Sequence, residues 1–294
     1  MRLKTRGDEQ SSLLASVNLG GPWREGQEPG PLRIESGRLA LVHRPPGSAT
    51  SVRELVGSVL QGTAGDGTTQ DIAICDTESD PTDPTMHWYR IEVWNDRTEE
   101  WENPCTPMAQ IPSPRALAVA GVWDRSGAHR GAAGKFTFAC ETGTIVKCAN
   151  WGYKPWQTRN GQSLEDVHQA CTRMARADYC GDGRSHTTEN TIIDHYDRAG
   201  INQRQTTAMG TWDPALAEFE AAWTPDGAYC LRRQRHENGV DAILKECPGR
   251  FRIESEDLGT GDVCAVRQAE GKPNQVLLRN RVIKLGGQGL AQSP

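Results

Sequence analysis

The chain has 294 residues, of which 38 are acidic and 33 are basic, and its formal net charge is −5. Because no long basic run occurs, the composition argues against nucleic acid and against an anionic membrane surface as partners. No stretch approaches the ~18 consecutive apolar residues of a membrane helix, so we expect no transmembrane segment. A chain of this length is typical of about two domains of roughly 100 to 200 residues each.

Residues 1–33 are rich in glycine, glutamate, arginine and glutamine and show neither a helical nor a strand period. This composition predicts a disordered tail or linker. The first residues include basic side chains, but the apolar core of roughly 7 to 15 residues that marks a signal peptide is not visible among them.

Residues 34–113 contain short apolar runs separated by turns, which predicts a small β-rich region. In its last run, Tyr89, Ile91 and Val93 alternate with larger or charged side chains. By the two-residue period of a strand, we expect these three to face the core and Trp88 and Trp94 to lie on the opposite face. Four prolines between residues 104 and 114 then predict a domain boundary near residue 113.

Residues 114–294 alternate predicted strands and helices, which favours the α+β class. Residues 135–140 and 144–149 have the composition of two strands joined by a turn at Thr142-Gly143. Apolar residues at helical spacing predict a helix over 164–177. A second helix is expected to begin at Asp213-Pro214 and to end before Pro225.

Nine cysteines occur, and none belongs to a Cys-x-x-Cys pair of the kind found in zinc ribbons and thioredoxin-type redox sites. The spacing therefore indicates disulfides, an oxidising compartment and a secreted or cell-envelope protein. The predicted fold is α+β, with a small β-rich N-terminal region followed by a disulfide-stapled α+β domain. Cys264 is predicted to be the unpaired thiol, and the bridged cysteines are predicted to be Cys75, Cys105, Cys140, Cys148, Cys171, Cys180, Cys230 and Cys247.

Some pairings follow from position along the chain. Cys75 is predicted to pair with Cys105, because no other cysteine lies before residue 140. Cys230 is predicted to pair with Cys247 across a hairpin turn at Asn238-Gly239, although residues 241–246 are also compatible with a short helix. The other four, Cys140, Cys148, Cys171 and Cys180, are predicted to join each other in two strand-to-helix bridges.

The chain contains the segment Arg176-Ala177-Asp178-Tyr179-Cys180-Gly181-Asp182-Gly183-Arg184-Ser185-His186-Thr187. This segment resembles the signature of the bacterial ADYC domain family. Residues 137–140, 147–156 and 168–174 before it, and 193–197 and 219–223 after it, are also similar to blocks of that family. The resemblance covers about residues 115–250. It implies an exported bacterial protein and assigns no reaction.

The polar residues of the 178–197 segment are the candidate catalytic group. In this hypothesis a serine or cysteine is the nucleophile, a histidine is the base and an aspartate orients the histidine, although no G-x-S-x-G motif is present. In the structural alternative, Asp178 caps backbone amides of the glycine-rich turn and His186 is a hydrogen-bonded residue without a catalytic role. The candidates are Asp178, Cys180, Ser185, His186, Asp194 and His195.

A zinc site is the metal hypothesis, with a histidine and a cysteine one helical turn apart and a second such pair in the loop that follows. Because the spacing is irregular and Cys171 lies in an apolar stripe, disulfides are favoured, and no metal or cofactor is predicted. A calcium loop at Asp182 lacks the ordered oxygen ligands of an EF-hand. The four zinc candidates are His168, Cys171, Cys180 and His186.

Nine tryptophans are present, and aromatic faces are suited to stacking on sugars or peptide side chains. Packing in the core or between domains is the alternative for each. The predicted function is an extracellular or cell-envelope binding or structural module whose candidate partner is an extracellular glycan or protein. The alternative is an extracellular hydrolase that uses the 178–197 segment. The candidate binding residues are Trp88, Trp94, Trp151 and Trp156.

Overall fold

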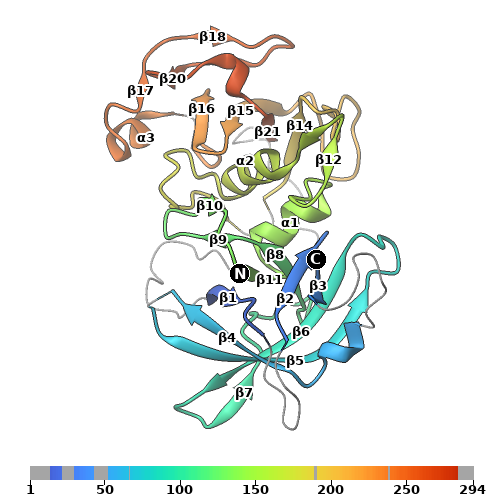
Figure 1. Ribbon diagram of the computed structural model, residues 1–294. Helices are drawn as coiled ribbons and strands as arrows, with labels where there is room; N and C mark the ends of the chain where they lie inside the picture. Colours follow the sequence, from blue (N-terminus) through green and yellow to red (C-terminus); the bar gives the residue numbers. More distant parts are fainter. Residues whose placement is uncertain are drawn as a thin grey trace, which may run out of the picture.

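The computed structural model describes residues 14–21, 30–42, 52–65, 67–188, 191–237 and 239–283. The first half of the chain forms a β-barrel, and the second half forms a disulfide-rich unit stacked on it (Figure 1). Strands account for 39% of the described residues and helices for 12%. The predicted α+β class is therefore wrong, because the protein is mostly β.

Six antiparallel strands close the barrel in the order β5-β4-β1-β11-β8-β6, and β6 pairs back with β5. Closure removes the free edges that a small open sheet would expose. The short strand β7 (Glu100–Glu102) extends β6 beyond the barrel as a hairpin. The barrel strands are β1 (Leu14–Asn18), β4 (Val59–Ala64), β5 (Thr69–Ser79), β6 (His87–Asn95), β8 (Ala116–Ala120) and β11 (Lys135–Cys140).

Alternation along the strands fills the barrel interior. Tyr89 and Ile91 on β6 are buried there beside Phe136 and Phe138 of β11, so the core face predicted for β6 is confirmed. The Tyr89 hydroxyl accepts a hydrogen bond of 2.8 Å from the Leu39 amide. This bond anchors a hairpin formed by β2 (Leu32–Glu35) and β3 (Arg38–Leu41), and a 3₁₀ turn, η1, spans Val52–Leu55.

Strands on both sides of residue 113 belong to the barrel, since β6 pairs with β8 and β8 pairs with β11. Strand β1 comes from the segment that was predicted to be a tail. We therefore propose that the first structural unit ends near Cys140 rather than at residue 113.

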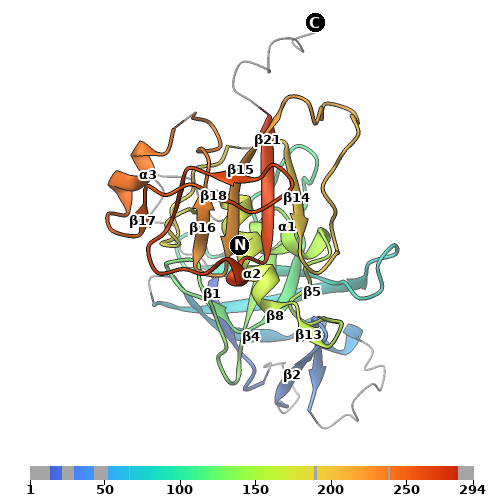
Figure 2. The same cartoon turned by 90° about the horizontal axis from the view of Figure 1, so that it is seen from above.

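The second unit contains a six-stranded antiparallel sheet in the order β14-β21-β15-β16-β20-β17 (Figure 2). Helix α2 lies between this sheet and the barrel, with α1 beneath it (Figure 1). None of the described helices is long and apolar enough to cross a membrane. The elements are α1 (Thr144–Asn150), α2 (Glu165–Arg176), α3 (Asp241–Glu246), β14 (Ile193–Asp197), β15 (Ala217–Thr224), β16 (Gly227–Leu231), β17 (Phe251–Arg252), β20 (Val266–Gln268) and β21 (Leu278–Ile283). Shorter elements are β9 (Val122–Trp123), β10 (His129–Arg130), β12 (Thr158–Arg159), β13 (Gln162–Ser163), β18 (Glu256–Asp257), β19 (Val263–Cys264) and the 3₁₀ turn η2 (Pro273–Gln275).

Two segments differ in type from their prediction. Residues 144–150 form helix α1 instead of a strand, because Ile145, Val146 and Ala149 make one apolar helical face that packs on the outside of the barrel. Residues 217–224 form strand β15 instead of a helix, because this strand is buried on both faces and shows no two-residue alternation. The predictions of α2 and of the strand at 135–140 are confirmed.

Four disulfides connect the elements. The predicted pairs Cys75–Cys105 and Cys230–Cys247 are wrong, and of the four cysteines predicted to join each other only Cys148 and Cys171 do so. Cys75 lies outside the barrel core and is unpaired, whereas Cys105 is buried next to Cys140. Residues 241–246 form a helix rather than a hairpin arm, so Cys247 is placed beside Cys180, and Cys264, which was predicted to be free, pairs with Cys230. The four bridges are Cys105–Cys140, Cys148–Cys171, Cys180–Cys247 and Cys230–Cys264.

Cys75 is expected to be the single thiol that alkylating reagents reach in the native protein. Partial burial of its sulfur, with smaller effects of Glu92 and Asp76, raises the pKa of the Cys75 thiol to about 11. Because the thiolate is the reactive form, labelling by iodoacetamide should be slow at pH 7 and should accelerate about tenfold per pH unit until pH approaches that pKa. Peptide mapping without reduction should find the label on Cys75, and label on Cys264 would contradict the pairing.

Candidate functional site

The Ala177-Asp178-Tyr179-Cys180 segment directly follows α2. Ala177 ends the helix in the left-handed conformation, with a φ of 52°. Asp178 is fully buried, and its carboxylate accepts hydrogen bonds from the consecutive amides of residues 181–183 at 2.9 to 3.2 Å. The Arg173 guanidinium donates to the same carboxylate at 2.6 Å. The structure therefore matches the structural interpretation of Asp178, in which it caps the turn.

Arg173 holds three loops at once. Besides Asp178, its guanidinium donates to the carbonyl of Pro225, at 3.0 Å, and to the carbonyl of Ser126. The loop after Asp178 packs so closely on the turn before β16 that a Cβ atom on Gly181 would lie 1.9 Å from the Asp226 carbonyl oxygen. Only glycine fits there, which explains one glycine of the signature segment.

A second buried network surrounds Tyr179. Its hydroxyl donates to Glu220 at 3.0 Å and accepts a hydrogen bond from the Arg235 amide at 2.7 Å. The Arg235 guanidinium binds both carboxylate oxygens of Glu220, and Asn280 donates to the same carboxylate at 2.7 Å. Burial, with Glu220 adding to it, raises the pKa of Tyr179 well above its usual value, so the phenol stays protonated. The Tyr179 ring also stacks on Trp223.

The other catalytic candidates also make structural contacts. Ser185 donates its hydroxyl to the Arg176 carbonyl at 3.1 Å. The two ring nitrogens of His186 lie 3.0 Å from the Ala177 carbonyl and 3.1 Å from a Glu246 oxygen.

Asp194 and His195 lie on a different element, β14, where Asp194 pairs with Arg281 at 2.6 Å. His195 stacks on Trp151, and burial lowers the pKa of its ring. Within the described residues no hydrogen bond joins Asp194 or His195 to Ser185 or His186, so the structure does not bring the candidates together.

The zinc hypothesis lacks its thiolates. Cys171 is bonded to Cys148 and Cys180 to Cys247, while a ring nitrogen of His168 lies 3.0 Å from the Ile145 carbonyl. In the part of the chain that the structure describes, no three histidine, cysteine or acidic side chains are grouped so that they would hold a metal ion.

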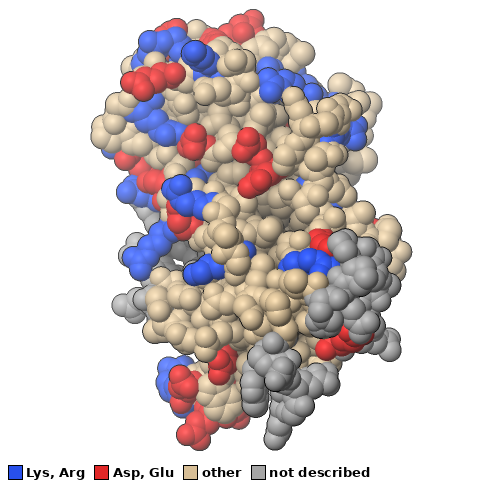
Figure 3. Space-filling view, viewed as in Figure 1, with Lys and Arg blue, Asp and Glu red and all other residues tan. Residues whose placement is uncertain are grey.

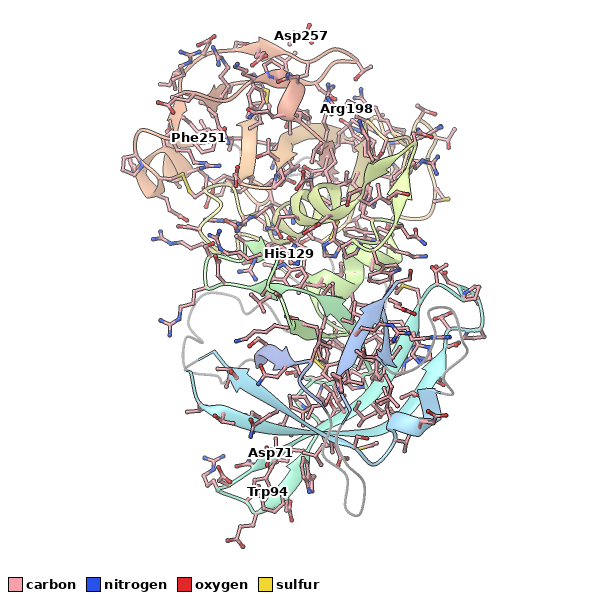
Figure 4. The ribbon with its side chains drawn as sticks, in the orientation of Figure 1. Asp71, Trp94, His129, Arg198, Phe251 and Asp257 are labelled. Carbon is pink, nitrogen blue, oxygen red and sulfur yellow. A yellow bond between two sulfur atoms is a disulfide. The ribbon has the colours of Figure 1, made fainter. Side chains whose placement is uncertain are left out.

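The four candidate tryptophans have different surroundings. Trp88 is buried between the barrel and α1, and its indole donates to Asp80 at 2.9 Å. Trp94 pairs edge-to-face with Trp101 on the β6–β7 hairpin, which projects from the base of the barrel in Figure 4. Trp151 packs on His195. Trp156 lines a cavity.

This cavity has a volume of about 780 Å³ and lies where the barrel, the β2–β3 hairpin, the β9–β10 hairpin and the start of the second unit meet. Its wall includes the apolar side chains of Leu19, Leu32, Ile34, Val119 and Trp156. His129, labelled in Figure 4, marks its position between the two units.

The cavity wall also contains polar groups. His129 pairs with Glu165 at 2.9 Å, and its other ring nitrogen lies 2.8 Å from the Ala120 carbonyl. The ring sits so close to Gly121 that a Cβ atom there would lie 2.4 Å from it. The Trp156 indole nitrogen is buried and has no hydrogen-bond partner among the described residues. Trp156 was among the predicted binding residues, whereas His129 and the Gly-Ala-Ala-Gly run at 131–134 were not predicted. The small residues of that run, between two strands, were the available indication.

The ADYC domain model matches residues 52–237. The chain belongs to the ADYC domain family. The match includes both units, from the barrel strand β4 to the residues that follow β16, and the tetrapeptide of the family's name is the buried segment after α2. No curated protein and no solved structure matches this ADYC protein. On the face shown in Figure 3, acidic and basic side chains are interspersed over the second unit.

We predict that Asp178→Asn lowers the free energy of unfolding by about 3 to 5 kcal/mol, because it leaves the buried Arg173 without its counter-charge. Asp182→Asn is the matched control, since the Asp182 side chain is 39% exposed and its ion pair is at the surface, where the expected loss is below about 1 kcal/mol. Urea unfolding measures both variants. Equal stability of the two variants would show that the buried pair is not what holds the loop.

We also predict that the free energy of unfolding decreases as the pH is lowered, and that the decrease begins at a higher pH than the one at which carboxylates titrate. Burial lowers the pKa of His168 to about 4, whereas an unfolded chain titrates near 6.5. The contribution of the buried, neutral His168 to the free energy of unfolding is therefore complete above about pH 6.5. It decreases as the pH falls towards 4, by up to about 1.4 kcal/mol per pH unit. His168→Gln should flatten the dependence between pH 6.5 and 5 in urea unfolding. His87, whose pKa burial also lowers to about 4, and His195, whose pKa burial also lowers, should account for a remaining slope. A slope unchanged by His168→Gln would contradict the assignment.

Proposed function

We propose that this ADYC protein is an exported binding module, secreted or attached to the cell envelope of a bacterium, which holds a small ligand in the cavity between its two units. The observation that carries the proposal is the cavity itself. Its volume of about 780 Å³ falls in the range of roughly 300 to 1,000 Å³ typical of small-molecule sites. Four disulfides support an oxidising compartment.

The lining favours an apolar or amphiphilic ligand over a glycan. Sugars stack on a free indole face, but the six-membered ring of Trp156 lies against Gly37, where a Cβ atom would be only 3.1 Å away. The apolar side chains of Leu32, Ile34 and Val119 offer dispersion contacts and few directional hydrogen bonds. Binding would therefore depend mainly on removing apolar ligand surface from water.

The alternative, a hydrolase that uses the 178–197 segment, gains no support from this geometry. A general base must reach a substrate proton, and a nucleophile needs that base within hydrogen-bond distance. Asp178 is fully buried and its carboxylate is already bound by three amides and Arg173. Ser185 donates to a backbone carbonyl rather than to His186.

The neutral dye N-phenyl-1-naphthylamine tests the cavity. We expect its fluorescence to rise when it binds the native protein, and we expect Ala133→Trp to raise its Kd at least tenfold, because residue 133 is on the cavity wall. Ala215→Trp is the matched control, since Ala133 and Ala215 are both exposed loop residues but only Ala133 lines the cavity. An absence of dye binding, or equal Kd values for the two variants, would rule out the proposed function.

A further inference from the structure

We infer that the ligand of the cavity is a small amphiphile with one carboxylate, which is bound by the backbone amides of residues 131–134 and by Lys135. This inference rests on the proposed function and adds the chemical class of the ligand. It follows from the hydrogen bonds, the charges and the side-chain sizes along one wall of the cavity.

The backbone carbonyls and the backbone amides of the 131–134 loop differ in their hydrogen bonding. This loop joins β10 to β11 and lines the cavity along its whole length. Two of its four carbonyls accept hydrogen bonds, since Ala132 accepts from the Lys135 amide at 3.1 Å and Gly134 accepts from the Leu19 amide at 2.8 Å. Within the described part of the chain, the amides of 131–134 donate to no protein acceptor. Because the loop is largely exposed, these amides are open to solvent and to a ligand, and successive backbone amides in a turn are suited to binding an anion.

The charges along the wall leave one positive charge in excess when the His129 ring is protonated. Arg33 is paired with Glu35 at 2.5 Å, and both ring nitrogens of His129 face acceptors, the Glu165 carboxylate and the Ala120 carbonyl, so the protonated ring balances Glu165. Among the described residues Lys135 has no ion-pair partner, and it follows the loop directly at the start of β11. A single carboxylate would complement this ammonium group, whereas a second charge on the ligand would have no counterpart in the wall.

Side-chain size allows close approach. The loop has the sequence Gly-Ala-Ala-Gly, so no long side chain separates a ligand from the amides. The remaining wall, which includes Leu19, Leu32 and Val119, is apolar. A ligand with its carboxylate at the loop would place an apolar chain or ring against these side chains. The expected ligand is therefore a small organic acid with an apolar body.

Dodecanoate and dodecan-1-ol, which differ in charge but little in shape, test the inference by displacing N-phenyl-1-naphthylamine from the native protein. At low salt we expect dodecanoate to compete about tenfold better, the gain typical of one charge-assisted hydrogen bond. Lys135→Gln should remove this preference and leave the Kd of the neutral dye unchanged. Lys147→Gln is the matched control, because Lys147 is exposed on α1 and does not line the cavity.

The outcomes separate the two proposals. If the dye binds but dodecanoate has no advantage, or if Lys135→Gln keeps the advantage, the carboxylate assignment is wrong and the binding function stands. If the dye does not bind, the proposed function itself fails. The last competitor is an apolar pentapeptide, which is tested for dye displacement once with a free C-terminal carboxylate and once with an amidated C-terminus. A preference for the free peptide without a preference for dodecanoate would overturn the assignment to a small acid in favour of a peptide terminus.

Discussion

The buried ion pair between Arg173 and Asp178 is the contact on which the junction of the two units depends. Both side chains are almost fully removed from water, which is costly unless every charged atom finds a partner. Arg173 reaches the turn before β16 and, through the Ser126 carbonyl, the turn between β9 and β10. Since His129 and the 131–134 loop follow that turn, the ADYC segment fixes the wall of the cavity from a distance.

Covalent and ionic restraints converge on the same helix. One disulfide joins α2 to α1, and a second ties the loop after α2 to Cys247, directly after α3. Helix α2 lies between the sheet and the barrel, and α1 packs on the outside of the barrel (Figures 1 and 2). The disulfides lie within the units, and the packing of α1 on the barrel joins the restrained helices to the first unit. A cavity between units that are already fixed costs a ligand little ordering entropy, which favours binding.

Sequence predicted those features that arise from local pattern. The face of β6 that carries Tyr89 and the helix at 165–176 follow from their periods, and the turn capped by Asp178 follows from an aspartate before glycines. Strand β15 was missed because burial on both faces removes its alternation. The disulfides other than Cys148–Cys171 were mispaired because cysteine order says nothing about which elements pack together. The cavity was missed because its wall combines residues from 19 to 165 that come together only when the barrel closes and the second unit packs on it.

We place the candidate site where polar groups have no protein partner in the described part of the chain, which is the cavity wall. The segment around Asp178 has more polar groups, but most of them are already paired. The segment around Asp178 is rich in reactive residue types, yet its carboxylate accepts four hydrogen bonds and has little capacity for a substrate. The cavity wall has the opposite character. The amides of 131–134 and the Lys135 ammonium have no acceptor among the described residues and are largely exposed, while apolar side chains line another part of the same cavity. A ligand with an acceptor group supplies what these donors lack, so recognition belongs to the cavity and the ADYC segment supports the scaffold that shapes it.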